Sequence, residues 1–193
     1  ISTARKRRLI VTQFQKQSFF RATVMFNLEK DKNFGEGKER VAEYIIKIAA
    51  SVASYFIERD ISLEVIAHSD EMIHIPFNKG AQHLEDVLKF LATAAPESRV
   101  CLGDIYEEFS PRIHDDSTLI VIMPDCDLQF LSLMLELKEK NVSLIPLIIK
   151  TATFLYPFEK RDIREETKAL PSYLFNLNPI FFSRGDNLEE VFS

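Results

Sequence analysis

Oxygen-bearing side chains lie at or just after the ends of two apolar runs of this sequence, residues 22–28 and 118–123. The side chains concerned belong to Asn27, Glu29, Asp31, Asp125 and Asp127. If both runs form neighbouring strands of a parallel sheet, their carboxyl ends meet at one edge, where ligands bind in such folds. Carboxylate and amide oxygens suit Mg²⁺, which is hard, octahedral and retains several waters. The spacing therefore favours a divalent cation site, with Mg²⁺ as the candidate ion.

A purely structural role for the same acids remains open at this point. Asp127 directly precedes Leu128, where a helix is expected to begin, so its carboxylate could accept from the free N–H groups of the first turn. Glu29 and Asp31 would then be ordinary loop acids.

The sequence lacks the motifs of several common enzyme classes. Residues 35–38 (Gly-Glu-Gly-Lys) do not have the spacing of a phosphate-binding loop, and no Gly-x-Ser-x-Gly stretch occurs. The four histidines are not spaced as a metal pair, and no nucleophile–base pair is visible. We therefore expect a binding protein and not an enzyme. The alternative is a metal-dependent hydrolase or phosphotransfer enzyme that uses the strand-end carboxylates.

Composition narrows the class of protein further. With 193 residues, 46% hydrophobic and 27% charged, the chain is long enough for one globular domain with a full core. The net charge of -5 argues against general nucleic-acid binding. The most apolar stretch, residues 142–149, is too short to cross a bilayer. Cys101 and Cys126 have no zinc-motif spacing, so reduced thiols are expected.

Alternating and continuous apolar runs predict strands, and apolar stripes at helical spacing predict helices between them. The predicted strands are residues 8–14, 22–28, 61–67, 72–77, 118–123, 142–149 and 180–183. The predicted helices are residues 41–56, 84–91, 102–109 and 128–137, with a short one after Asp186. Pro76 predicts that its strand lies at an edge, paired as a hairpin with residues 61–67. Pro146 conflicts with a central position for its strand.

Strands that alternate with helices require crossover connections and a sheet covered on both faces. We therefore predict an α/β fold, a three-layer sandwich with a mainly parallel sheet and an antiparallel edge strand.

Four stretches carry a resemblance to a known family. They are Ser2-Thr3-Ala4-Arg5 with the strand up to Phe14, the helix 41–56 running into residues 58–61, residues 77–84, and residues 119–125. In this order they resemble the bacterial family called domain of unknown function fifty-eight, whose C-terminal half is similar to a von Willebrand factor A (vWA) domain. The resemblance implies a vWA-like, Rossmann-like domain over residues 21–193, with residues 1–20 forming a strand and linker from a preceding domain.

The vWA resemblance implies a metal-ion-dependent adhesion site, but in degenerate form. Its first-loop positions correspond to Asn27, Glu29 and Asp31, and its third-loop Asp corresponds to Asp125. The position of its Thr falls near Val100, which offers no side-chain oxygen. The resemblance therefore implies Asn27, Glu29, Asp31 and Asp125 as the candidate metal ligands, with Mg²⁺ as the candidate ion. No other cofactor is expected. Lys30 and Asp127 are the candidate partner-binding residues.

The resemblance also implies a partner and a location. Members of this family have N-terminal membrane helices and often occur beside MoxR-type AAA ATPases. The start at Ile1 is that expected of a piece cut from a longer chain. We therefore expect the cytoplasmic domain of a membrane-anchored bacterial protein that binds a protein partner, with a MoxR-type AAA ATPase as the candidate.

Overall fold

A six-stranded sheet organises the residues that the computed structural model describes, which are 21–127, 130, 137, 141–155 and 177–188. The strands are β1 (Arg21–Asn27), β4 (Ser62–His68), β5 (Met72–Asn78), β6 (Thr118–Pro124), β7 (Ser143–Ile149) and β8 (Ile180–Phe182). Their order across the sheet is β5-β4-β1-β6-β7-β8. The ladders are parallel except for β4–β5, which is antiparallel. The predicted hairpin therefore forms at the margin of the sheet, with β5 as the edge strand.

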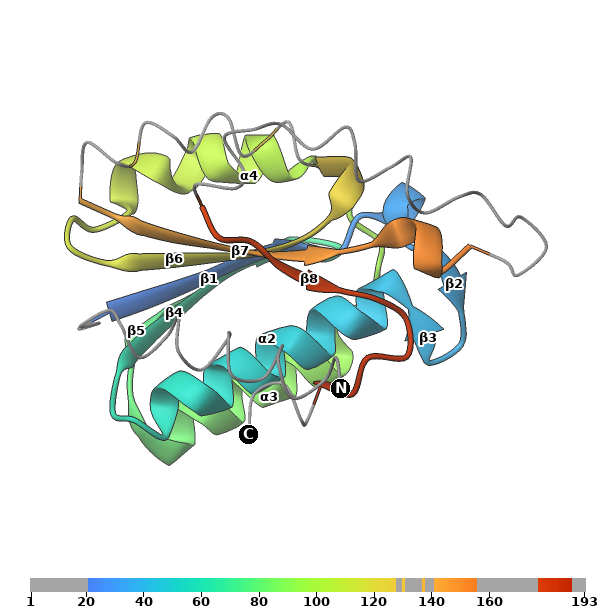
Figure 1. Ribbon diagram of the computed structural model, residues 1–193. Helices are drawn as coiled ribbons and strands as arrows, with labels where there is room; N and C mark the ends of the chain where they lie inside the picture. Colours follow the sequence, from blue (N-terminus) through green and yellow to red (C-terminus); the bar gives the residue numbers. More distant parts are fainter. Residues whose placement is uncertain (1–20, 128–129, 131–136, 138–140, 156–176, 189–193) are drawn as a thin grey trace.

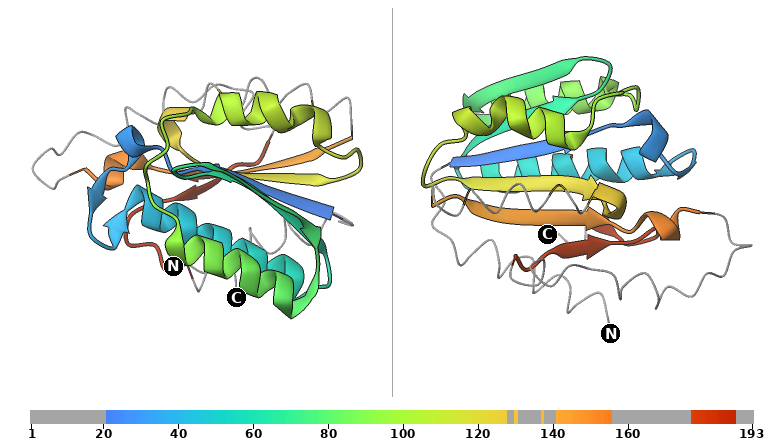
Figure 2. Two further views of the ribbon diagram at one scale, coloured as in Figure 1. Left: turned by 180° about the vertical axis from the view of Figure 1, so that it is seen from behind. Right: turned by 90° about the horizontal axis from the view of Figure 1, so that it is seen from above.

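Helices cover both faces of this sheet, as the α/β prediction required. Helices α2 (Val41–Ile57) and α3 (Gly80–Thr93) lie on one face, and α4 (Leu102–Phe109) lies on the other (Figures 1 and 2). The short elements are η1 (Lys30–Lys32), β2 (Gly35–Glu36), β3 (Glu39–Arg40), η2 (Ser110–Arg112), η3 (Asp125–Asp127) and η5 (Thr151–Thr153). The described residues thus form a three-layer sandwich, which confirms the predicted fold class.

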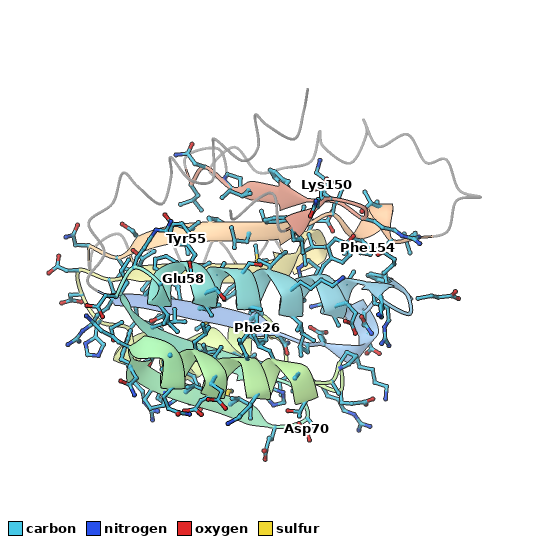
Figure 3. All side chains as sticks on the ribbon, turned by 90° about the horizontal axis from the view of Figure 1, so that it is seen from below. Phe26, Tyr55, Glu58, Asp70, Lys150 and Phe154 are labelled. Atoms are coloured by element: carbon cyan, nitrogen blue, oxygen red, sulfur yellow. The ribbon has the colours of Figure 1, made fainter. Side chains whose placement is uncertain are left out.

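The central strands β1 and β6 are buried along most of their length and largely apolar, because both of their faces are covered. Every residue of β6 is buried, and β1 is buried from its second residue onward. Alternate side chains enter opposite layers: Phe26 packs in the core beneath α2 and α3, whereas Met25 packs in the core beneath α4. Phe26 lies between α2 and α3 when the sheet is viewed through them (Figure 3), with its ring stacked on Phe90 of α3.

Pro146 is accommodated in β7 because its nitrogen faces a side of the strand with no ladder partner at that height. The N–H of Ser143 donates to Ser117, toward β6, and the N–H of Lys150 donates to Phe182, toward β8. Since N–H groups alternate in direction along a strand, the nitrogen of Pro146 faces the β8 side. There the ladder with β8 begins only at Leu147. The proline therefore removes no hydrogen bond to β6.

The predicted elements that fall on described residues are confirmed with small shifts of their ends. The strand predicted at 61–67 forms at Ser62–His68, and the helix predicted at 102–109 has those bounds. The strand at 8–14, most of the helix at 128–137 and the terminal helix beyond Leu188 lie outside the described residues. Within the described ranges, no helix combines the length and apolarity needed to cross a membrane.

Candidate functional site

The carboxyl ends of β1 and β6 meet at the point where the strand order reverses. From β1 the chain passes to β4 on one side, and β6 later takes the place on the other side. Residues Phe26 and Ile122 are partners in the parallel β1–β6 ladder, so the segments after Asn27 and after Pro124 leave the sheet side by side. Such a switch point is where open α/β sheets bind ligands.

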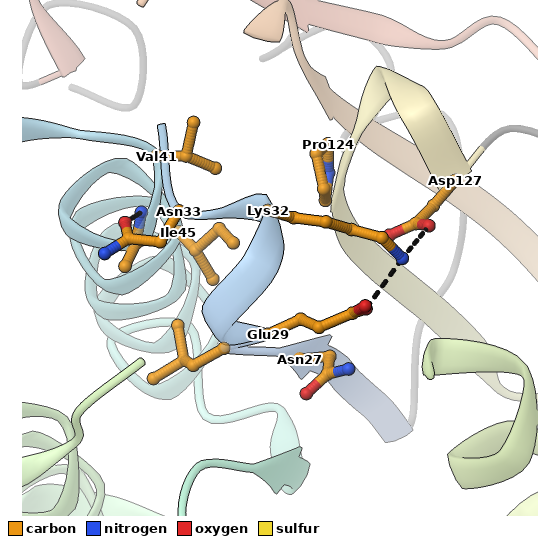
Figure 4. Close-up of a pocket in the computed structure, with 10 residues that line it drawn as sticks. Asn27, Glu29, Lys32, Asn33, Val41, Ile45, Pro124 and Asp127 are labelled. Carbon is orange, nitrogen blue, oxygen red and sulfur yellow. Dashed lines mark hydrogen bonds and ion pairs between the residues drawn. The ribbon is translucent and has the colours of Figure 1, made fainter. Parts of the chain in front are cut away.

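A small cavity lies at this junction (Figure 4). It is lined by Asn27, Leu28, Glu29, Lys32, Asn33, Val41, Ala42, Ile45, Pro124 and Asp127. Its volume of about 10 Å³ has room for roughly one water molecule. Polar groups come from the loops after β1 and β6, and the start of α2 supplies the apolar wall.

Lys32 joins the two loops through a double ion pair. Its Nζ lies 2.6 Å from Oε2 of Glu29 and 2.5 Å from Oδ1 of Asp127, as the dashed lines in Figure 4 show. We call Glu29, Lys32 and Asp127 the strand-end cluster. Their side chains are 20%, 23% and 13% exposed, respectively, so water screens the charges only in part.

The strand-end cluster keeps the Lys32 side chain charged. Partial burial by itself lowers the pKa of Lys32, because it disfavours the ammonium form. Hydrogen bonds and Coulomb attraction from Asp127 and Glu29 act in the opposite direction and together outweigh the burial. The net result is a pKa well above the ordinary range for lysine. Lys32 is therefore a permanent cation at any physiological pH.

Asn27 fixes the floor of the cavity to a third loop. Its Nδ2 donates to the backbone oxygen of Val100 at 2.5 Å, and the residue is 5% exposed. Its Oδ1 is buried and has no hydrogen-bond partner among the described residues. Ser98, buried in the same loop, donates its hydroxyl to Val100 and pairs as a backbone bridge with Glu29. Val100 has no side-chain oxygen, and the hydroxyl of the nearby Ser98 bonds to the backbone of its own loop.

Asp125 is directed to a different partner. Its Oδ1 accepts from the backbone N–H of Thr151 at 3.1 Å and from the Thr151 hydroxyl at 2.5 Å. Thr151 begins η5, immediately beyond β7. Asp125 thus ties the end of β6 to the end of β7, and it is not among the residues that line the cavity.

The remaining candidate residues lie on the surface beside the cavity. Asp31 and Lys30 are both exposed on η1. Lys30 Nζ lies 2.7 Å from Oε2 of Glu97, in a pair whose side chains are 54% and 53% exposed. Of the six candidate site residues, the fold therefore brings Asn27, Glu29 and Asp127 into the cavity and places Lys30, Asp31 and Asp125 around it.

Lys32 was not among the candidates from sequence. The available signal was its position three residues after Glu29, the spacing at which side chains meet on one turn of helix. That signal shows a local pair but cannot show that Asp127, far along the chain, completes it.

A second buried carboxylate lies within the sheet, on the face that α4 covers. Glu64 accepts from the Thr23 hydroxyl at 2.9 Å through Oε2, and its Oε1 lies 2.8 Å from Nε2 of His74. The His74 ring in turn packs edge-on against Phe109 of α4. We call Thr23, Glu64 and His74 the sheet-face cluster. Across the described ranges, no three His, Cys, Asp or Glu side chains are grouped as metal ligands would be.

Comparison with solved structures places the fold. BatB from Bacteroides thetaiotaomicron superposes with a TM-score of 0.51 at 10% identity, over 67% of this chain and 66% of that one. An aerotolerance-related membrane protein from Bacteroides fragilis gives a TM-score of 0.53 at 9% identity, over 88% and 94%. A von Willebrand factor type A protein from Catenulispora acidiphila gives 0.50 at 11% identity, over 69% and 34%. The chain thus spans about two thirds of the first structure and one third of the third.

These likenesses establish a vWA-like α/β fold. Because the sequence identities are so low, they show the fold alone. No curated protein matches the sequence significantly. A family model does match, over residues 1–140, and its description is "Protein of unknown function DUF58". Because that match covers most of the chain, the protein belongs to the DUF58 family.

Proposed function

We propose that this chain is a protein-interaction module that docks a partner protein on the loops at the carboxyl ends of β1 and β6. The observation that carries the proposal is the strand-end cluster, in which Lys32 holds the carboxylates of both Glu29 and Asp127. Carboxylates engaged in this way are poorly available as a general base or as ligands of a catalytic metal. A rigid polar surface of this kind suits recognition better than chemistry.

Hydrogen bonds within the chain already connect the loops around the cavity in the absence of a partner. The N–H of Lys30 donates to the oxygen of Ser98 at 3.0 Å, and the N–H of Ser98 donates to the oxygen of Leu28 at 3.1 Å. Asn27 adds its side-chain bond to Val100. A surface whose backbone is already ordered loses less entropy on binding, which favours affinity.

Exposed charged side chains lie around these hydrogen-bonded loops. Asp31 and the Lys30–Glu97 pair are in contact with solvent beside the partly buried ion pairs of the strand-end cluster. In protein interfaces, charges at the rim set orientation and association rate more than they set affinity. We therefore assign Lys30 to the partner-binding rim, and Asp127 to the support of the surface through Lys32.

The family resemblance extends the proposal to a partner and a place. The partner is a MoxR-type AAA ATPase, and the domain is the cytoplasmic part of a bacterial membrane protein anchored by N-terminal helices. The similar structure from Bacteroides fragilis is described as an aerotolerance-related membrane protein, which supports the membrane association.

The test is a binding titration of the purified chain with a MoxR-type AAA ATPase from the same organism. Lys30→Glu should slow association and weaken binding, because it reverses a charge on the rim. The matched control is Lys79→Glu, since Lys79 also forms an exposed pair, 3.2 Å from Asp60. Lys79 follows β5 and Asp60 precedes β4, so this pair lies at the opposite edge of the sheet. Equal binding by both variants would contradict docking on the strand-end loops. Hydrolysis of a phosphate ester that needs Glu29 would instead favour the enzyme reading.

A further inference from the structure

We infer that the ammonium group of Lys32 takes the cation position of the strand-end site, so that the docking surface of this domain is assembled without a divalent metal ion. The part of this inference that concerns docking rests on the proposed function, whereas the position of Lys32 does not. Its basis is the geometry of three side chains and the space between them.

Lys32 forms the link that a bridging cation would form. Glu29 follows β1 and Asp127 follows β6, and two carboxylates approaching the same point repel each other unless a positive charge lies between them. Nζ of Lys32 lies there, at 2.6 Å from one carboxylate and 2.5 Å from the other. The chain therefore supplies its own counter-charge, covalently held three residues after Glu29.

The space at the site does not fit a hydrated divalent ion together with Lys32. Mg²⁺ needs six oxygen ligands at close to octahedral angles and usually keeps several waters. The cavity of about 10 Å³ holds roughly one water molecule. A second cation would also be repelled by the ammonium of Lys32, which already lies 2.6 Å from one carboxylate and 2.5 Å from the other. The residues present thus suit the lysine arrangement and not a metal centre.

The oxygens that a metal would need are used elsewhere or too few. Asp125 is bonded twice to Thr151, and Asp31 is exposed on η1. Two buried oxygens accept no hydrogen bond from the described groups: Oε2 of Glu29, which is held only by its ion pair with Lys32, and Oδ1 of Asn27. The cavity beside Oδ1 of Asn27 has room for one water molecule, which can donate a hydrogen bond to this oxygen.

The consequence for docking is that chelators and added Mg²⁺ leave partner binding unchanged. A partner would meet a surface in which two carboxylates and one ammonium leave a single negative charge that no metal ion offsets. Recognition through a metal-bound acidic side chain of the partner is then replaced by contacts to the loops themselves.

The inference is tested on the chain alone, by Mn²⁺ titration followed by electron paramagnetic resonance and by thermal unfolding in Mg²⁺. The wild type and the control Lys30→Met should show no saturable binding at millimolar metal. Lys32→Met should gain a site, because Glu29 and Asp127 then lack a counter-charge, and the added change Asp127→Asn should abolish it. Lys32→Gln, whose amide can still donate to a carboxylate, replaces the Met variant if circular dichroism shows that variant to be unfolded.

Two results would overturn the inference. One is saturable Mn²⁺ binding by the wild type that Asp127→Asn removes, since the lysine would then share or yield its place. The other is a folded Lys32 variant that gains no metal binding at all. Neither result depends on a partner protein, so failure here leaves the docking proposal intact, and failure of the ATPase titration leaves the role of Lys32 intact.

Discussion

The carboxylates of the strand-end cluster are partly buried and that of the sheet-face cluster is buried, but the chain positions the two clusters by different means. In the sheet-face cluster, Thr23 and Glu64 are cross-strand partners in the β1–β4 ladder, and the β4–β5 register shifts at Glu64. Backbone pairing thus places the side chains of Thr23 and Glu64 next to each other. In the strand-end cluster, Lys32 and Asp127 belong to short 3₁₀ turns outside the sheet.

The two clusters also differ in the charge that compensates the carboxylate. Glu64 is held by a hydroxyl and an imidazole, of which the second is charged only when protonated. Glu29 and Asp127 are held by an ammonium that is always charged. A hydroxyl and an imidazole suffice where a ladder fixes the geometry, whereas a fixed charge is needed where two loops outside the sheet are held together. Loss of the central partner should therefore be more damaging at the strand ends.

The largest effect is expected from Lys32→Met. This change keeps much of the apolar length of the side chain but leaves two partly buried carboxylates without a counter-charge. Removing one partner of such a pair typically costs about 3 kcal/mol of unfolding free energy. Urea denaturation at neutral pH measures the difference. A loss no larger than that of Thr23→Val would contradict the contrast between the clusters.

A smaller loss is expected from Thr23→Val in the sheet-face cluster. The substitution preserves shape and removes the hydroxyl that donates to Oε2 of Glu64 at 2.9 Å. A hydrogen bond to a buried carboxyl group is worth about 1.5 kcal/mol, and the ladder that positions Glu64 stays in place. The same denaturation experiment gives the value, with Thr93→Val as the control because Thr93 is exposed and bonds only within its own helix. A cost above that of Lys32→Met would reverse the proposed order.

The contrast also explains how far the sequence could predict the site. Apolar runs located β1 and β6, and the parallel topology then placed Asn27, Glu29 and Asp127 at one edge. Strand periodicity carries that information because backbone pairing determines it. Pro146 fits the same logic, since its direction in the strand follows from alternation once the neighbours of β7 are known.

The partners of the individual acids could not be predicted in this way. Asp125 and Asp127 are two residues apart, yet one bonds to Thr151 and the other to Lys32. That division depends on how η1, η3 and η5 are oriented, and one-turn helices have too few residues to show a period. The role of Lys32 could not be predicted for the same reason, because Lys32 lies in the three-residue η1. Sequence thus locates the edge, and side-chain geometry decides what the edge can bind.

A smaller difference between the two clusters is expected in how the contribution of Lys32 to stability depends on pH. Because the pKa of Lys32 is raised in the folded state, its contribution to stability is complete below the ordinary lysine pKa of about 10.4. It declines as the pH rises above that value toward the folded pKa. The stability gap between the wild type and Lys32→Met should therefore be constant from pH 6 to 9 and about 1 kcal/mol smaller at pH 11. Paired urea titrations at these pH values measure it; a gap that shrinks at neutral pH would mean that Lys32 is not held as a cation.

The smallest effect is expected from Lys30→Met, two residues before Lys32. Lys30 has an ion pair of similar length, 2.7 Å to Glu97, but about half of each side chain is exposed. Water and salt screen such a pair, so its loss should change the unfolding free energy by less than about 0.5 kcal/mol. The variant should nevertheless slow partner association, because the rim charge acts before contact is made. Denaturation and association kinetics on one protein sample separate the two roles. A large loss of stability would show that the rim supports the fold, and the division between buried support and exposed recognition would fail.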